Sequence, residues 1–310
     1  MNKPQNFRKV EKLMGNRFEL CIVHENETIA EQLLNDAVTE IQRIEALLST
    51  FKDDSQVNQI NQQAGIRPVK VDAEVFDLIA RSNRISQLTD GAFDISYGGI
   101  DKSLWNFDTT MTCLPTEEIA RQSVHLINFN NIELNDTEKS VFLKNKGMRI
   151  GFGGIGKGYG ADKARQLLVN KGVKSGFINA SGDLTAWGRQ LDGKSWSIGL
   201  SDPDGPENYL AHLNISDAAI ATSGTYEKFV IINGMRYSHT INPKTGFPTS
   251  GIKSVSILTT NAELADAMAT PVMVMGVKSG LELINQMNLM ECIIIDDFNT
   301  IHTSDGLKIS

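Results

Sequence analysis

The stretch from Ile150 to Lys163, IGFGGIGKGYGADK, constrains this chain more than any other part of its sequence. It places six glycines and Lys157 between an apolar, strand-like run and a helix-like run. Glycine at this density weakens regular structure, so the backbone here needs either positive φ or a close approach to another group. A strand–loop–helix passage presents backbone N–H groups and a helix N-terminus, which together bind phosphate. Two interpretations remain open: a phosphate-binding loop, and a tight turn without a ligand.

Two well-known glycine motifs fit this stretch only in part. The dinucleotide pattern G-x-G-x-x-G fits from Gly151 to Gly156, but it lies in the middle of the chain. The next expected strand also ends in residues 179–181, Asn-Ala-Ser, where a dinucleotide-binding fold needs an acidic residue. The P-loop pattern fits as far as Lys157, but Gly158 stands where the magnesium-binding Ser or Thr belongs. The sequence therefore favours neither a Rossmann turn nor a P-loop.

The charge and cysteine content exclude several classes of protein. The net charge of −7 leaves no basic excess for a nucleic acid or an anionic membrane surface. Cys21, Cys113 and Cys292 lie far apart with no Cys-x-x-Cys pair, so we expect neither a disulfide framework nor a zinc–cysteine site. At 310 residues with 41% hydrophobic content, the chain can form a sizeable core without them.

The sequence contains no recognisable targeting or membrane segment. Residues 1–20 lack the apolar core of a signal peptide, and Cys21 follows no apolar leader of the kind that precedes a lipidation site. No apolar run reaches the roughly 18 residues that a transmembrane helix needs. We therefore expect a cytoplasmic protein; the alternative is a periplasmic or membrane-anchored protein whose leader has been removed.

Hydrophobic spacing predicts an α+β fold with no linker and no repeat. Apolar residues at three- to four-residue spacing predict a helix over residues 27–50, and Asp72 begins a second helix that ends near residue 89. Asn233-Gly234 predicts a type I′ hairpin within residues 228–241. Further helices are expected at about 159–171, from a capping box at 260–263, and near 278–288; strands are expected at 13–23, 176–183, 196–200, 213–224 and 254–260, with a hairpin near 132–144 and a pairing of 141–144 with 148–152. Residues 10–305 are expected to form a single domain.

Asp266 and Thr270 form a candidate cation site. They stand four residues apart on a predicted helix, so both side chains lie on one face. A carboxylate and a hydroxyl, completed by carbonyls and waters, suit Mg²⁺. The alternative is a helix-terminal aspartate with Thr270 bonded back to it. Pro271 removes the helical partner of the Ala267 carbonyl and biases Thr270 out of the helical region.

Three further side chains are candidates for a functional role. His239 lies beside a loop fixed by glycine and proline, where it is a candidate general base or a structural histidine. Phe51 is an isolated apolar residue in a polar stretch, and the alternative to a binding role is a cap on the preceding helix. Asp94 stands between Phe93 and Ile95, so it points away from both, toward water or toward a polar site.

Taken together, these segments resemble the ApbE family of FAD:protein FMN transferases over about residues 13–276. The resemblance rests on short motifs in family order, none of which is specific alone. They are MGNRFEL, LLSTFKDDSQVNQIN, GAFDIS, GFGGIGKGYGAD, INASGD, TSGTYEKF, RYSHTINPKTGFP and ADAMAT.

The resemblance implies a Mg²⁺-dependent enzyme on a T-fold-like architecture of two interleaved lobes with FAD bound between them. It implies transfer of FMN from FAD to a Ser or Thr hydroxyl of an acceptor flavoprotein, with release of AMP. His239 matches the histidine that activates the acceptor hydroxyl, and Lys157 faces the cofactor from the glycine-rich loop. The implied FAD-binding positions are Met14, Phe51, Ala92, Phe93, Asp94, Gly151, Lys157 and Thr240; the implied metal ligands are Gly154, Asp266 and Thr270.

Two departures from the family pattern keep other functions open. Gly151 stands where the family usually has Asp, and Pro271 is unusual after Thr270. The alternatives are an FAD pyrophosphatase that yields FMN and AMP, and a non-catalytic FAD-binding protein.

Overall fold

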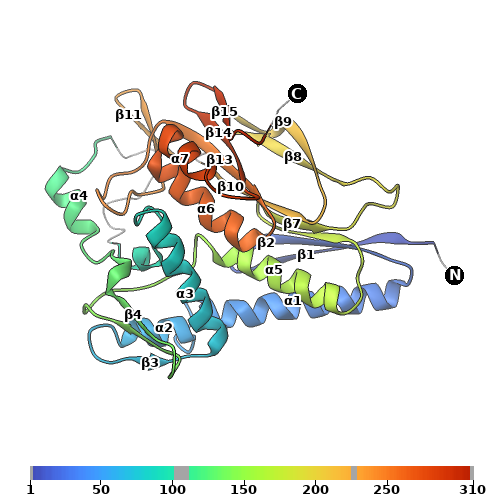
Figure 1. The fold of residues 1–310 in the computed structure, drawn as a ribbon, viewed down its shortest axis with the longest axis horizontal. Helices are drawn as coiled ribbons and strands as arrows, with labels where there is room; N and C mark the ends of the chain where they lie inside the picture. Colours follow the sequence, from blue (N-terminus) through green and yellow to red (C-terminus); the bar gives the residue numbers. More distant parts are fainter. Residues whose placement is uncertain (1–2, 101–111, 225–228, 308–310) are drawn as a thin grey trace.

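The computed structural model describes residues 3–100, 112–224 and 229–307. Its centre is an eight-stranded sheet in the order β1-β2-β6-β7-β10-β13-β14-β15 (Figure 1), in which every neighbouring pair is antiparallel. These strands are β1 Gln5–Leu13, β2 Asn16–His24, β6 Gly176–Ala180, β7 Asp183–Trp187, β10 Ala218–Gly224, β13 Ile252–Thr259, β14 Glu291–Asp296 and β15 Ile301–Thr303. The expected α+β class is confirmed.

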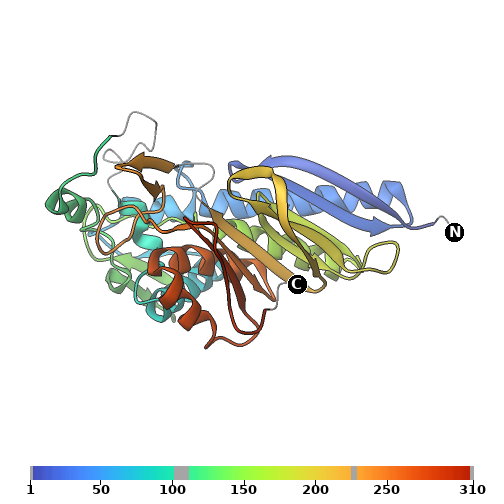
Figure 2. The ribbon, with the colours of Figure 1, turned by 90° about the horizontal axis from the view of Figure 1, so that it is seen from above.

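Helices cover one face of this sheet and a hairpin covers the other. On the helical face lie α1 (Glu27–Leu48), α5 (Gly156–Asn170) and α6 (Ala262–Met275). The β8–β9 hairpin, Trp196–Asp202 and Gly205–Ile215, packs on the opposite face. Strand β2 contributes side chains to both layers. Phe18, Leu20 and Ile22 face the helices, while Cys21 faces the hairpin. Figure 2 shows the same layers from above.

The rest of the chain forms a smaller part beside α6. It contains α2 (Gln56–Gln62), α3 (Ala73–Leu88) and a small sheet with the order β3-β5-β4. The remaining elements are β3 Val69–Lys70, η1 Ile95–Gly99, α4 Glu117–Ser123, η3 Phe129–Asn131, β4 Ile132–Asn135, β5 Ser140–Leu143, β11 Phe229–Ile232, β12 Met235–Ser238 and α7 Val277–Ile284. One apolar core runs from this part into the main sheet, since Val141 of β5 and Val255 of β13 belong to the same buried cluster.

Several expected elements are confirmed. Helices α1 and α3 match the predictions to within two residues. Asn233 and Gly234 join β11 to β12 with φ of 52° and 78°, as a type I′ turn requires. The β4–β5 hairpin lies where the sequence predicts it.

Other predictions about the elements are wrong. The sequence does not predict strand β1, because Lys9 and Glu11 interrupt its apolar face, and the strand pairs with β2 across Met14-Gly15. Helix α2 lies in a segment expected to be irregular. Residues 141–144 do not pair with 148–152, because β5 pairs with β3 and β4 instead.

Helix α6 corrects two more expectations. Its N-cap is Asn261, whose side chain accepts the Leu264 N–H at 2.9 Å, and not Thr260. Pro271 lies inside α6 and does not move Thr270 out of the helix, which continues to Met275. Asp266 and Thr270 therefore stay one turn apart on the same helical face.

Candidate active site

The entrance to the glycine stretch is fixed by side chains and backbone from distant elements. Asn61 of α2 accepts the Ile150 N–H at 2.7 Å and donates to the Ile150 carbonyl at 3.0 Å, as a neighbouring strand would. The Gly151 N–H donates to the carbonyl of Ile95 at 2.9 Å. The chain therefore enters the loop in one defined direction before α5 begins at Gly156.

Gly158 lets α5 touch α6. A Cβ atom built on Gly158 would lie 2.0 Å from the Ala262 carbonyl oxygen and 2.9 Å from Asp266 Cβ. No other residue fits there without moving one helix. This close approach places the first turn of α5 directly against Asp266.

Two buried carboxylates surround the Lys157 ammonium. Its Nζ forms an ion pair with Asp183, at the start of β7, and a second with Asp266 Oδ1 at 3.2 Å. Asp183 and Asp266 are only 3% and 4% exposed. The other oxygen of Asp266, Oδ2, accepts the Gly158 N–H at 3.1 Å. Three elements of the fold thus place their charges at one point beside the glycine stretch.

These charges perturb one another. Burial, and then the nearby Asp266 carboxylate, raise the pKa of Asp183 to about 7. Burial alone lowers the pKa of Lys157, but the Asp266 and Asp183 carboxylates outweigh it and raise that pKa. Lys157 therefore stays a cation at neutral pH, and a fixed positive charge is available to an anionic ligand.

The three proposed cation ligands lie together at this point. A Cβ atom built on Gly154 would lie 3.6 Å from Thr270 Oγ1, so the loop backbone runs past the hydroxyl. Thr270 Oγ1 also lies 3.5 Å from Ser223 Oγ at the end of β10. Among the described residues no group of three or more His, Cys, Asp or Glu side chains is placed to hold a metal. A cation here would use one carboxylate, a hydroxyl and a backbone carbonyl, a set of oxygens that fits a hard cation with bound waters.

Met14 and Thr50 contact the glycine stretch. Met14 sits in the β1–β2 turn, and its sulfur would lie 3.1 Å from a Cβ atom on Gly160. The methyl group of Thr50, the residue before Phe51, would lie 3.5 Å from a Cβ atom on Gly151. Phe51 is 96% exposed, so the alternative that it caps the end of α1 is wrong.

Ala92, Phe93 and Asp94 form a buried segment, of which Phe93 lies next to the loop at Gly154. All three are buried, and a Cβ atom on Gly154 would lie 3.6 Å from Phe93 Cε2. Asp94 does not face water: its Oδ1 accepts from the N–H and hydroxyl of Ser96 at 2.8 and 2.7 Å, and its Oδ2 accepts the Phe129 N–H at 2.8 Å. Burial raises the pKa of Asp94, and these hydrogen bonds oppose the shift. Its carboxylate therefore fixes the local backbone.

His239 and Thr240 lie just beyond β12. His239 is exposed, and the Thr240 N–H donates to Ser238 Oγ at 3.0 Å. The Ser238 hydroxyl in turn contacts the sulfur of Met273 at 3.8 Å, one turn beyond Thr270 on α6. The segment that carries His239 therefore packs against α6, the helix that carries the candidate cation ligands Asp266 and Thr270. Residues 225–228 of the TSGTYEKF motif lie outside the described residues.

Sequence reasoning missed the roles of Asp183 and Asp162. Asp183 ends the INASGD motif and enters a fully buried strand, which is an unusual place for a carboxylate. Asp162 Oδ2 accepts the Glu263 N–H at 2.8 Å at the start of α6, and burial raises the pKa of Asp162 to about 6. Both residues stood in motifs on which the family resemblance rests, but no local spacing indicated their partners.

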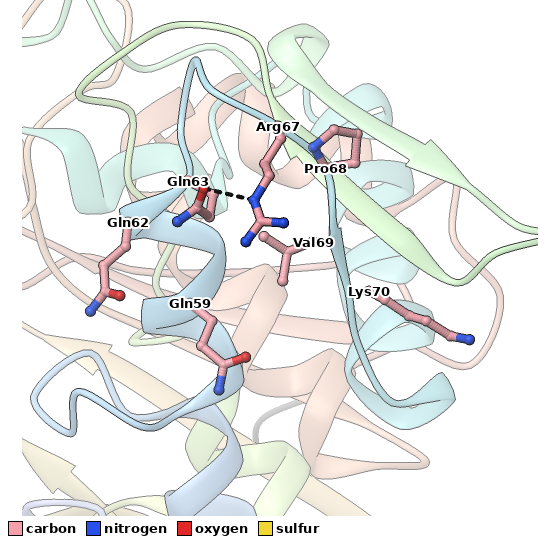
Figure 3. A pocket seen from close by; sticks show the side chains of 7 residues that line it. All are labelled: Gln59, Gln62, Gln63, Arg67, Pro68, Val69 and Lys70. Atoms are coloured by element: carbon pink, nitrogen blue, oxygen red, sulfur yellow. Dashed lines mark hydrogen bonds between the residues drawn. The ribbon is translucent and has the colours of Figure 1, made fainter.

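Two surface cavities lie on the described part of the chain. One, of about 210 Å³, is formed by α2 and the start of β3, where Arg67 donates to Gln63 at 3.1 Å (Figure 3). The other, of about 720 Å³, lies beside α3, α5 and the start of α6, and the ion pair between Arg81 and Glu263 belongs to it. Lys157 and Asp266 line neither cavity, but Tyr159 and Asp162 of α5 and Glu263 of α6 line the larger one, which therefore lies next to the candidate site.

The fold and the site together define an α+β protein with a lysine and hard oxygen donors at a glycine-rich helix N-terminus. This chain belongs to the ApbE family, whose model matches residues 14–294. The resemblance inferred from the sequence is therefore confirmed.

Individual relatives are similar along most of their length. The chain is 30% identical to an FAD:protein FMN transferase of Treponema pallidum (strain Nichols), over 88% of this chain and 80% of the relative. It is 31% identical to an FAD:protein FMN transferase of Klebsiella pneumoniae (strain 342), over 91% and 87%. The crystal structure of the ApbE protein from Thermotoga maritima superposes with a TM-score of 0.87 at 28% identity, covering 97% of this chain and 98% of that one.

None of the described helices combines the length and the apolar character needed to cross a membrane.

Proposed function

We propose that this protein is an FAD:protein FMN transferase that uses Mg²⁺. Two contacts near the start of α5 carry the proposal in this ApbE-family chain. Lys157 pairs with Asp266, and the Gly154 backbone lies beside the Thr270 hydroxyl. The reaction moves FMN from FAD to a Ser or Thr hydroxyl of an acceptor flavoprotein and releases AMP.

The Gly154 carbonyl, the Asp266 carboxylate and the Thr270 hydroxyl would hold the Mg²⁺. When bound, the cation neutralises charge on the phosphoryl oxygens of FAD. Lys157 would add a fixed positive charge at the same place. Together they stabilise the charge that develops as the pyrophosphate breaks.

The residues around the loop would bind the rest of FAD between the two interleaved lobes. The exposed ring of Phe51 supports an aromatic contact with the cofactor. Met14, Gly151 and Thr240 would contact the cofactor, and Ala92, Phe93 and Asp94 would complete the binding site. The 3.6 Å approach of Phe93 Cε2 to a Cβ atom built on Gly154 supports a contact between this segment and the loop.

His239 would act as the general base for the acceptor. Its exposure supports this role, because a hydroxyl on another protein has to reach it. The acceptor oxygen forms a bond to the FMN phosphorus while the bond from that phosphorus to the bridging oxygen breaks. The hydroxyl proton passes to His239, and AMP leaves with the bridging oxygen.

We further propose that residues 10–305 form one catalytic domain of two interleaved lobes. The continuous core that joins β5 to β13 supports this unit.

The test is an incubation of the protein with FAD, Mg²⁺ and a candidate acceptor flavoprotein, followed by mass spectrometry. We expect the acceptor to gain one FMN phosphoester at a Ser or Thr and AMP to appear in equal amount. FMN and AMP in solution with an unmodified acceptor would instead show an FAD pyrophosphatase. Tight FAD binding without FMN or AMP at any Mg²⁺ concentration would show a non-catalytic FAD-binding protein, an outcome motivated by Gly151 and Pro271.

A further inference from the structure

Both oxygens of Asp266 are already engaged in this fold. Oδ2 accepts the Gly158 N–H at 3.1 Å, and Oδ1 lies 3.2 Å from the Lys157 ammonium. A divalent cation bound through Asp266 Oδ1 meets the positive charge of Lys157 there, and Oδ2 already accepts one hydrogen bond. Two cations on one carboxylate oxygen repel each other, so the ammonium and the metal compete for this atom.

The Lys157 ammonium has a second carboxylate partner, Asp183, which is not one of the proposed metal ligands. It begins β7 directly after a tight turn, in which Ser181 and Gly182 have φ of 52° and 101°. The Ser181 hydroxyl donates to the Arg17 carbonyl at 3.0 Å, and the Gly182 N–H donates to Asn179 Oδ1 at 2.8 Å. The carboxylate of Asp183 is therefore held by the sheet, whereas Lys157 has a flexible side chain of four methylene groups.

We propose that Asp183 is a positioning residue that holds the Lys157 ammonium away from Asp266 when the divalent cation binds. This inference rests on the proposed cation site of the transferase. Without the charge of Asp183, Asp266 is the one carboxylate among the described residues that pairs with Lys157, and the ammonium competes more strongly with the metal. Asp183 thus sets the metal affinity of the site through Lys157, without touching the metal itself.

A double-mutant cycle separates this mechanism from simple attraction between Asp183 and the metal. Asp183→Asn keeps the shape of the side chain and removes its charge, and we expect divalent-cation affinity to fall about tenfold. Lys157→Met removes the competing ammonium and should raise that affinity. In the Lys157→Met background, Asp183→Asn should change affinity by less than about twofold, because no ammonium is left to position. Direct attraction would give the same loss in both backgrounds.

The affinities are measured by Mn²⁺ titration, followed by the electron paramagnetic resonance of the free ion, with no FAD present. Displacement by Mg²⁺ gives the affinity for that ion, and Asp266→Asn tests whether binding occurs at this site. Melting temperatures of all variants show whether each is folded. If Asp183→Asn is unfolded, Asp183→Ser, which is smaller and still able to accept a hydrogen bond, replaces it in the cycle.

A large effect of Asp183→Asn that vanishes in the Lys157→Met background supports the proposal. The proposal is overturned if Asp183→Asn lowers affinity equally in both backgrounds or in neither. It is also overturned if Asp266→Asn leaves Mn²⁺ binding unchanged. The proposed function is tested independently by acceptor labelling. A protein that shows the coupling but labels no acceptor contradicts the function alone, and a protein that labels an acceptor without the coupling contradicts only the role of Asp183.

Discussion

Gly158 of α5 and Ala262 of α6 approach so closely that a Cβ atom on Gly158 would lie 2.0 Å from the Ala262 carbonyl oxygen. This contact is what brings Lys157 and the Gly158 N–H to Asp266. The Asp266 site therefore depends on the absence of a side chain at one position.

Gly158→Ala should separate the two helices and destabilise the protein by about 2–3 kcal/mol, because the added methyl group meets backbone that cannot rotate away. Gly153→Ala is the control in the same glycine stretch, since nothing lies within 4 Å of a Cβ atom built on Gly153. Urea denaturation of both variants measures the difference. Equal stability of Gly158→Ala and the wild type would contradict the close packing of α5 on α6.

Phe51→Ala should weaken FAD binding without changing stability. The ring is 96% exposed, so it adds little to the core, and loss of an aromatic contact with the cofactor costs about 1–2 kcal/mol, or roughly tenfold in the KM for FAD. Phe298→Ala is the control, because Phe298 is 89% exposed in the loop before β15. An unchanged KM for FAD in Phe51→Ala would remove Phe51 from the binding site.

His239→Ala should slow transfer to the acceptor by about 10²–10⁴-fold while FAD still binds, since only proton removal from the acceptor hydroxyl is lost. His24→Ala, at a half-buried histidine at the end of β2, should keep full activity. Single-turnover labelling of the acceptor and an FAD titration give the two quantities. Full transfer by His239→Ala would exclude His239 as the base.

Glu74 should make stability depend on pH in the acid range. Burial opposes ionisation, but Arg43, Tyr159 and Lys163 outweigh it and lower the pKa of Glu74 from 4.5 to about 2. Because the pKa is lower in the folded state, the stabilisation is complete above pH 4.5 and is lost as the pH falls toward 2. After allowance for solvent screening it amounts to about 1–2 kcal/mol.

The check is the free energy of unfolding of wild type and Glu74→Gln between pH 5 and the acid limit of folding. The difference in unfolding free energy between wild type and Glu74→Gln should shrink as the pH falls. Glu138→Gln, a change at an exposed position, should follow the wild type. A gap that stays constant with pH would show that Glu74 stabilises the fold by packing alone.

Local patterns were enough to predict α1, α3 and the β11–β12 hairpin, because helical spacing and the Asn233-Gly234 turn are short-range signals. Strand β1 was missed because Lys9 and Glu11 lie on the same face as Phe7 and Leu13, so this edge strand lacks an apolar stripe. Helix α2 was missed because it is short and polar, and its Asn61 serves a strand-like contact with Ile150.

The sequence likewise predicted some residues of the candidate site and missed others. The four-residue spacing of Asp266 and Thr270 and the glycine stretch were visible in the sequence, and the structure brings Gly154 to Thr270. The partnership of Lys157 with Asp183 was not visible, because it depends on the antiparallel pairing of β6 with β7 and on the packing of α5 over that sheet. Contacts between elements distant in sequence carry no local signature.

The central claim is that Asp266, beside Lys157, serves Mg²⁺-dependent transfer of FMN. The most direct measurement is the rate of acceptor labelling as a function of Mg²⁺ concentration for wild type and for Asp266→Ala, with both shown to be folded. We expect saturable dependence on Mg²⁺ in the wild type and a loss of at least about 100-fold in the variant. A variant that keeps wild-type Mg²⁺-dependent labelling would contradict the account.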